Sequence, residues 1–197
     1  MKITQIQQHK RNKNMVHLYV DDVYKASVYI DEMLKSGLVI GKEVDEEALN
    51  EAIRNSRNYH LLNLCLGFIA HRSRSEKEIR DYIKKKIYTY KYDPHDIDAD
   101  AIVEKLSKYH YVNDDSFAEN WATARIKKGV GPYRLKLELA QKGIDKEKIS
   151  EVVNNLDRES IENAKQMLSE KYLKKHKFKD DREKDWKLKQ FLMSKGF

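Results

Sequence analysis

A short spacing pattern occurs three times in this chain and limits its fold more than any other feature. An apolar residue is followed at the fourth place by a second apolar residue and, three places later, by lysine. The copies begin at Ile79, Leu135 and Leu188, so their offsets are 56 and 53 residues. A nearly constant offset predicts tandem helical units that bury their apolar faces against their neighbours.

The pattern also indicates where each helix ends. In the second copy Lys142 is followed by Gly143, and in the third Lys195 is followed by Gly196. A glycine at this place is typical of a helix stop. The first copy departs from the other two, because Ile87 stands where they have glycine.

The composition agrees with a helical fold. Charged residues make up 36% of the chain and hydrophobic residues 40%, while the 197 residues include only 7 glycines and 2 prolines. This balance favours long helices with solvated faces over a turn-rich β protein. We predict a mainly α protein whose tandem three-helix repeats form an elongated or curved array, with a small antiparallel β element at the N-terminus.

Four parts of the chain can be distinguished. Residues 1–44 should form the small sheet and a short helix, because β-prone stretches alternate there with turn-forming residues. Residues 45–112 should form a linking helix, interrupted by the polar run "RNSRN" (54–58), and the first three-helix module. Residues 113–157 should form the second three-helix module, and residues 158–197 a third, basic three-helix module.

The most distinctive stretch is "FAENWATARIKKGVGPYRLKLELAQKGI", residues 117–144. Its glycines suggest a phosphate-binding loop, but the spacing G-x-x-x-x-G-K-[ST] after a strand is absent. Gly129 as a helix stop and Pro132 as the first residue of the next helix explain the same residues. Two short helices joined by such a turn also describe a DNA-reading helix-turn-helix, although the repeat accounts for them without DNA.

No pattern in the sequence points to catalysis, a metal or a cofactor. Cys65, the only cysteine, lies in an apolar run and is expected to be a small buried hydrophobe. The seven histidines lack metal-ligand spacing. The acidic run "DPHDIDAD" (93–100) lacks the glycine and glutamate of a calcium loop and is predicted to initiate a helix.

Two further expectations concern location and the tyrosine-rich run. The first residues lack the apolar core of a signal peptide, and no apolar stretch is long enough to span a membrane, so we expect a cytoplasmic protein. Tyrosines and lysines alternate within residues 82–92. They could stack on the bases of a single strand, but without a sheet platform we expect them to line a long loop between helices.

The positive charge is concentrated near the C-terminus. The formal net charge is +7, and residues 165–197 alone, with eleven Lys/Arg and five Asp/Glu, contribute +6. This segment would attract an anionic partner through long-range attraction and counterion release. A solvated lysine-rich helix face has the same composition, so charge alone leaves both interpretations open.

Taken together, these stretches resemble the RecX family of bacterial RecA regulators. The similar stretches are residues 73–86, 111–145 and 187–197, while residues 3–22 resemble the β-rich extension of members from Gram-positive bacteria. The aspartates, Phe-Ala, Gly-Pro and Lys-Gly of the second stretch are the most specific part. The chain departs from the family at Lys86-Ile87, where Lys-Gly is frequent, and in the long connection that follows.

The resemblance implies a non-enzymatic regulator in homologous recombination, DNA repair and the SOS response. It implies binding to RecA and its nucleoprotein filament on single-stranded DNA, with negative modulation of recombinase, ATPase and co-protease activity. We expect a monomer without a membrane partner, and only weak direct contact with single-stranded DNA. The alternative is a general nucleic-acid-binding protein that acts without RecA.

Basic side chains in two places are the candidates for contact with an anionic filament. The first set, which we name the junction group, flanks the glycines of residues 129–131. The second set, the tail group, lies in the basic C-terminal segment. The junction group consists of Arg125, Lys127, Lys128, Arg134 and Lys136, and the tail group of Lys174, Lys175, Lys177, Lys187 and Lys189.

Overall fold

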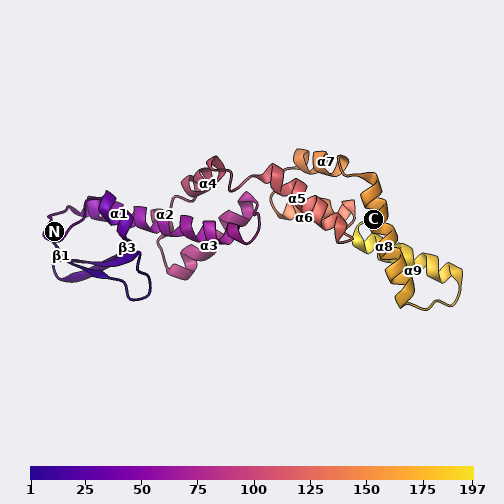
Figure 1. Cartoon of the computed structure of the whole chain (residues 1–197), viewed down its shortest axis with the longest axis horizontal. Helices are drawn as coiled ribbons and strands as arrows, with labels where there is room; N and C mark the ends of the chain where they lie inside the picture. Colours follow the sequence, from indigo (N-terminus) through magenta and orange to yellow (C-terminus); the bar gives the residue numbers. More distant parts are fainter. The chain divides into compact units, whose positions relative to one another are not determined.

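The computed structural model describes residues 1–197 and contains a three-stranded sheet, nine α-helices and one 3-10 turn (Figure 1). It confirms the predicted mainly α class with a small antiparallel sheet at the N-terminus. The elements are β1 (Ile3–Gln8), β2 (Met15–Val20), β3 (Val23–Tyr29), α1 (Ile30–Lys35), α2 (Glu46–Ala70), α3 (Glu76–Tyr90), η1 (Pro94–Asp96), α4 (Ala99–Lys108), α5 (Asp114–Lys127), α6 (Pro132–Gln141), α7 (Lys146–Asn154), α8 (Arg158–Lys175) and α9 (Asp181–Lys195).

The chain divides into two compact units. The first unit consists of residues 1–72 and 79–111, and the second of residues 73–78 and 112–197. No helix of either unit is long and apolar enough to cross a membrane.

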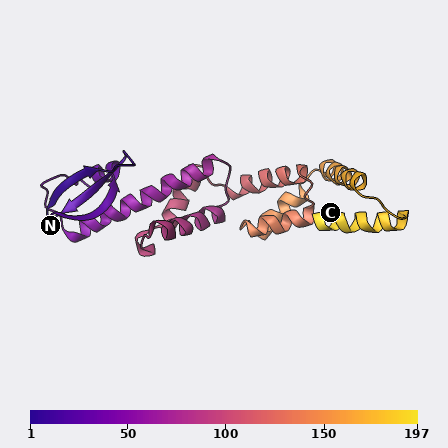
Figure 2. The same cartoon turned by 90° about the horizontal axis from the view of Figure 1, so that it is seen from below.

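In the first unit the sheet has the order β1-β2-β3, with both pairs antiparallel. The tight turn between β2 and β3 uses Asp21 and Asp22 at φ +48° and +64°, a conformation that aspartate tolerates better than most residues. The sheet and α2 share one apolar core, in which Leu18 of β2 is buried together with Leu49 and Ala52 of α2. An isolated hairpin has marginal stability in water. Helix α2 lies beside the sheet (Figure 2) and supplies the apolar surface that stabilises it.

Helix α2 continues through the polar run 54–58, where the sequence indicated an interruption. The run stays helical because its polar groups find partners. Ser56 is buried, and its Oγ accepts a hydrogen bond of 2.8 Å from the backbone N–H of Tyr29. Asn58 donates to the carbonyl of Asp96 and accepts from the N–H of Asp98, at 3.0 and 2.8 Å.

Two smaller predictions for the first unit are confirmed. The acidic run 93–100 forms η1 and then starts α4, whose N-cap Asp98 accepts a hydrogen bond from Ala101 N–H. Cys65 is buried at 1% exposure, and burial raises the pKa of its thiol to about 12. The protonated thiol packs as a small hydrophobe.

The three copies of the spacing pattern end their helices in the same way. In each, an N–H just beyond the helix donates to a carbonyl five residues earlier: Tyr92 to Ile87, Ile144 to Leu139, and Phe197 to Leu192. This is the Schellman arrangement, which requires a left-handed residue just after the helix. Glycine fills that place in the second and third copies, at Gly143 (φ +85°) and Gly196 (φ +91°).

The first copy stops later because Ile87 cannot serve as this left-handed residue. Helix α3 therefore runs on to Tyr90, and Lys91 adopts φ +54°. The expectation that the tyrosines line a loop was wrong for Tyr82, Tyr88 and Tyr90, which are helical. Tyr82 stacks on Phe68 with ring centroids 4.1 Å apart, so it contributes to packing within the first unit.

The lysine of each copy lies over an aromatic ring. Lys86 Nζ is 5.1 Å from the Tyr82 ring centroid, Lys142 Nζ is 4.9 Å from that of Trp121, and Lys195 Nζ is 5.4 Å from that of Phe191. Cation–π contacts at such distances contribute about 0.5–2 kcal/mol each. The repeated lysine is therefore part of the structure of each helix end.

Residues 158–197 form two helices, α8 and α9, and the predicted third helix of this segment was wrong. Asp157 and Asp180 cap the two helices, and no glycine or proline divides the 18 residues of α8. Ile161 and Ala164 on α8 pack into the core formed by α5, α6 and α7. The boundaries proposed for the modules stay a prediction.

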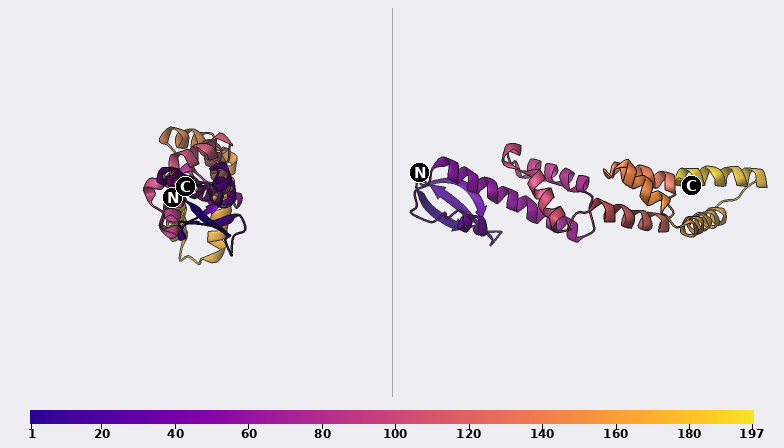
Figure 3. Two further views of the ribbon diagram at one scale, coloured as in Figure 1. Left: turned by 90° about the vertical axis from the view of Figure 1, so that its left-hand side faces the viewer. Right: turned by 90° about the horizontal axis from the view of Figure 1, so that it is seen from above.

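The C-terminal end of α9 meets the start of α6 (Figure 3, right). Gly131 N–H donates to the carbonyl of Lys195 at 2.7 Å, and Tyr133 N–H donates to that of Gly196 at 3.1 Å. A Cβ on Gly131 would lie 2.2 Å from the Gly196 carbonyl carbon. Gly131 is therefore required for close backbone approach as well as for the turn.

Replacing Gly131 with alanine should separate these two backbones, because the clash is with main chain that cannot rotate away. We expect Gly131→Ala to destabilise the second unit by about 1–3 kcal/mol. Gly67→Ala in α2 is the matched control, since a Cβ there meets nothing within 4 Å; it should stabilise by about 0.5–1 kcal/mol through helix propensity. Denaturant unfolding and amide exchange at Gly131 and Tyr133 measure both, and unchanged exchange in Gly131→Ala would contradict the contact.

Candidate functional site

The junction group lies where α5 ends and α6 begins. The side chain of Asn113 caps α5 by accepting from Ser116 N–H at 2.9 Å, and Gly129 at φ +78° ends the helix. Pro132 is the first residue of α6, as predicted. The apolar faces of both helices are buried in one core, which fixes the basic side chains on the outer sides of the two helices.

Arg125 is engaged inside the protein. Its guanidinium forms a two-pronged pair with the carboxylate of Glu138 on α6, and the Nε–Oε2 distance is 2.6 Å. The indole N–H of Trp121 donates to the same carboxylate at 3.3 Å, and Arg134 Nε lies 3.6 Å from it. Glu138 thus gathers three side chains, and the role of Arg125 here is to join α5 to α6.

The hydrogen bonds from Arg125 hold the pKa of Glu138 below its ordinary value, with the charge of Arg125 and the indole N–H adding to the effect. A carboxyl group with a lowered pKa in the folded state stabilises the fold above its unfolded pKa. That stability is lost as the pH falls through the folded pKa. The Glu138 cluster should therefore weaken on acidification and be intact at neutral pH.

The other members of the junction group are accessible. Lys127, Lys128 and Lys136 are exposed and form no ion pair. Arg134 is also exposed, and its Nη1 lies 3.5 Å from the carbonyl of Ser194. Of the five predicted residues, these three lysines keep a full, unpaired charge toward solvent.

The tail group lies on α8, on α9 and in the loop between them. Lys174 and Lys175 form the last turn of α8, where positive charge is favoured by the helix dipole. Lys177 follows in the loop, and Lys189 is exposed on α9. Lys187 pairs with Glu183 at 2.8 Å, one turn earlier on α9.

All ten predicted residues lie in the second unit. They do not all have the same role, because Arg125 and Lys187 are paired with carboxylates. No group of three or more His, Cys, Asp or Glu side chains has an arrangement that could hold a metal ion. The predicted residues that have no ion pair are exposed lysines, which carry positive charge toward solvent.

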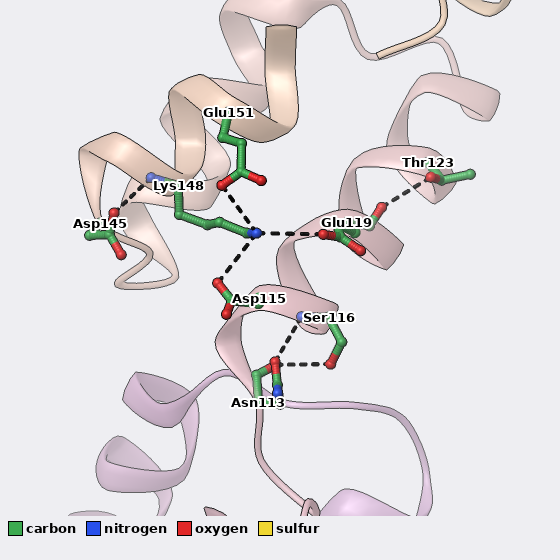
Figure 4. Close-up of polar contacts among 8 residues, drawn as sticks. All are labelled: Asn113, Asp115, Ser116, Glu119, Thr123, Asp145, Lys148 and Glu151. Atoms are coloured by element: carbon green, nitrogen blue, oxygen red, sulfur yellow. Dashed lines mark hydrogen bonds and ion pairs between the residues drawn. The ribbon is translucent and has the colours of Figure 1, made fainter. Parts of the chain in front are cut away.

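Lys148 is a structural cation that the sequence did not single out. Figure 4 shows its Nζ pointing between Asp115, Glu119 and Glu151, at 3.4, 3.5 and 3.3 Å. Desolvation lowers the pKa of Lys148, but the bonds and charges of Glu151 and Asp115 outweigh it, so the pKa is raised. Lys148 therefore joins α7 to α5 and is not a free charge.

Family models match two parts of the chain. The model of the RecX second three-helix domain matches residues 113–153, and the model of the N-terminal domain of regulatory protein RecX matches residues 1–45. The first match contains the whole junction group. The second covers the sheet and α1.

Curated relatives carry the same family name. Regulatory protein RecX of Bacillus velezensis is 34% identical over 197 residues, which cover 99% of this chain and 72% of that protein. The protein of that name from Clostridium tetani is 32% identical, with coverages of 100% and 88%. That of Listeria welshimeri is 36% identical over 166 residues, and this chain spans 60% of its length.

Two solved structures share the fold. A crystal structure of regulatory protein RecX superposes with a TM-score of 0.71 at 23% identity, covering 100% of this chain and 94% of the other. RecX from Lactobacillus salivarius gives a TM-score of 0.58 at 24% identity, covering 71% and 87%. At these identities the similarity concerns the fold alone.

Glu138→Gln should destabilise the second unit by about 1–3 kcal/mol, because it leaves the half-buried Arg125 without its anionic partner. The variant should also lose part of the acid sensitivity of the wild type as the pH falls below the ordinary glutamate pKa of about 4.3, since the lowered pKa of Glu138 is its source. Denaturant unfolding across this pH range measures both effects. Glu147→Gln, on the exposed first turn of α7, is the control and should change stability by less than about 0.5 kcal/mol; equal pH profiles for wild type and Glu138→Gln would contradict the assignment.

Proposed function

Because this chain belongs to the RecX family, as its identity with full-length relatives shows, we propose that it regulates RecA negatively. In this proposal it binds RecA and the RecA filament on single-stranded DNA, and lowers recombinase, ATPase and co-protease activity. It acts without catalysis, as a monomer in the cytoplasm.

The observation that carries the proposal is the gathering of unpaired lysines in the second unit. Lys127, Lys128 and Lys136 on α5 and α6 are exposed, and so are Lys174, Lys175, Lys177 and Lys189 farther along the chain. A nucleoprotein filament presents closely spaced phosphates, and a cationic surface is attracted to it over about 10 Å at 0.1 M salt. Electrostatic complementarity of this kind sets association rate and orientation more than affinity.

The roles within the junction group follow from its contacts. Arg125 positions α6 through Glu138, so reversing its charge would disturb folding as well as binding. Lys127 and Lys128 lie at the exposed end of α5 and form no ion pair. They are the residues whose substitution reports on contact with a partner.

Lys127→Glu combined with Lys128→Glu should weaken inhibition of RecA by about tenfold, because two contact charges are reversed. The measurement is RecA ATPase on single-stranded DNA against increasing concentrations of this protein. Lys84→Glu with Lys85→Glu, an equally exposed adjacent pair on α3, is the matched control for net charge and should leave inhibition unchanged.

Three outcomes decide against parts of the proposal. Full inhibition by the folded Lys127/Lys128 variant removes these residues from the contact surface. An equal loss of inhibition in the Lys84/Lys85 variant would show that the effect depends on net charge and not on the position of Lys127 and Lys128. Tight binding to bare DNA that by itself accounts for any effect on RecA would favour a general nucleic-acid-binding protein.

A further inference from the structure

A cleft lined by aromatic rings and basic side chains lies between α8 and α9 in the second unit. Its volume is about 420 Å³, within the range of small-ligand sites. No aspartate or glutamate lines it. The lining residues are Tyr172, His176, Lys177, Phe178, Trp186, Lys187, Gln190 and Phe191.

Most of the rings in the cleft are stacked on one another. Tyr172 stacks on Phe191 with centroids 4.4 Å apart and on His176 at 4.2 Å, and Phe178 lies 6.2 Å from Tyr172. These contacts hold the loop and the two helices together. The cleft is therefore already formed without a ligand, and the stacked rings are part of its lining.

Trp186 is not part of this stack. Its side chain is 61% exposed, and it contacts no other ring. Burial of the other rings contributes to folding, but an exposed indole gains little from the hydrophobic effect. An exposed tryptophan at the rim of a preformed cleft offers a flat face to a ligand.

The charge beside the cleft is positive. The segment 171–179 contains five lysines and no acidic residue. Lys177 lines the cleft and is exposed, and Lys189 is exposed one turn from Trp186 on α9. The carboxylate of Glu183 is engaged by Lys187 and by the N–H of Lys179 at 2.8 and 2.6 Å, whereas Asp185, next to Trp186 in the sequence, is exposed.

Flat rings together with free lysines suit one class of partner. Proteins that hold single-stranded nucleic acids combine aromatic faces, on which bases stack, with cations that follow the phosphates. An acidic peptide would use the lysines but would gain little from the exposed indole face. A duplex would offer no base face to the indole, because its bases are already stacked on one another.

We propose that the α8–α9 cleft binds an unpaired nucleic-acid strand, with a base stacked on Trp186 and phosphates held by Lys177 and Lys189. This deepens the proposed function and rests on it, because it makes the strand in the filament the ligand of the tail group. It assigns a role to Trp186, which is not among the ten predicted residues. By stacking on a base, Trp186 would distinguish a nucleic acid from other polyanions.

The chain has only two tryptophans, which allows a direct optical test. In a Trp121→Phe variant, Trp186 is the only tryptophan, and oligothymidylate should quench its fluorescence. In Trp186→Phe, which retains Trp121, the same strand should leave the fluorescence unchanged. An abasic strand of equal length, which has the phosphates without the bases, should bind about tenfold more weakly and leave Trp186 unquenched.

A second measurement does not depend on the fold of the Trp121 variant. Fluorescence anisotropy of a labelled oligothymidylate should show about tenfold weaker binding to Trp186→Ala than to the wild type. Lys177→Gln should lower the slope of log affinity against log salt by about 0.7, the value for one lost phosphate contact on a single strand. Lys146→Gln, exposed on α7, is the control and should leave the slope unchanged.

Several results would overturn the cleft assignment. They are equal affinity of Trp186→Ala and wild type, equal binding of the abasic strand or of polyglutamate, and quenching by duplex equal to that by single strand. Parallel RecA ATPase assays separate this proposal from the previous one. If the protein inhibits RecA but the strand does not quench Trp186, strand binding in the cleft is wrong and the regulatory function stands. If the strand quenches Trp186 but RecA is not inhibited, the regulatory function is wrong and strand binding in the cleft stands.

Discussion

The end-to-end contact between α9 and α6 is the interaction on which the second unit depends. The first N–H groups of a helix and the last carbonyls of another have no partners within their own helices. Here Gly131 and Tyr133 donate to Lys195 and Gly196, so each helix end satisfies the other. The partial charges of the two ends are opposite, which adds to the attraction. Because two glycines meet, the backbones come close enough for these bonds, and α9 is fixed against the helix that carries part of the junction group.

The net charge of the sequence is larger than the charge that a partner can contact. Three cations of the second unit form ion pairs within it. Arg125 pairs with Glu138, and Lys142 pairs with Glu78 at 2.5 Å. Lys148 pairs with three acidic residues of α5 and α7. These cations are used within the second unit, where they join helices whose own apolar faces are short. The charge available to a partner is therefore smaller than the sum over the sequence. The exposed lysines named above that form no ion pair lie on α6 and α9, at the C-terminal ends of α5 and α8, and in the loop after α8.

The sequence predicted features that depend on nearby residues. The helix start after the acidic run 93–100, and the stops at Gly129 and Gly143, were readable because a helix end is determined within about one turn. Contacts between distant residues were not readable. Gly131 and Gly196 are 65 positions apart, and the sequence does not show that a second backbone approaches Gly131. The same holds for Ser56, whose polar side chain looked like an interruption until its partner Tyr29 was known.

The two tryptophans show why a candidate site cannot be inferred from residue type alone. Trp121 stacks on Phe117, donates to Glu138 and lies under Lys142, so its apolar and polar parts are satisfied within the fold. Trp186 is largely exposed, beside rings that are already stacked. Helix α9 forms one side of the cleft, and Lys195 and Gly196 at its C-terminal end bond to α6. Removing the C-terminus would therefore disturb the folding of the second unit together with any binding by α9. Only single side-chain changes within the cleft separate recognition from stability.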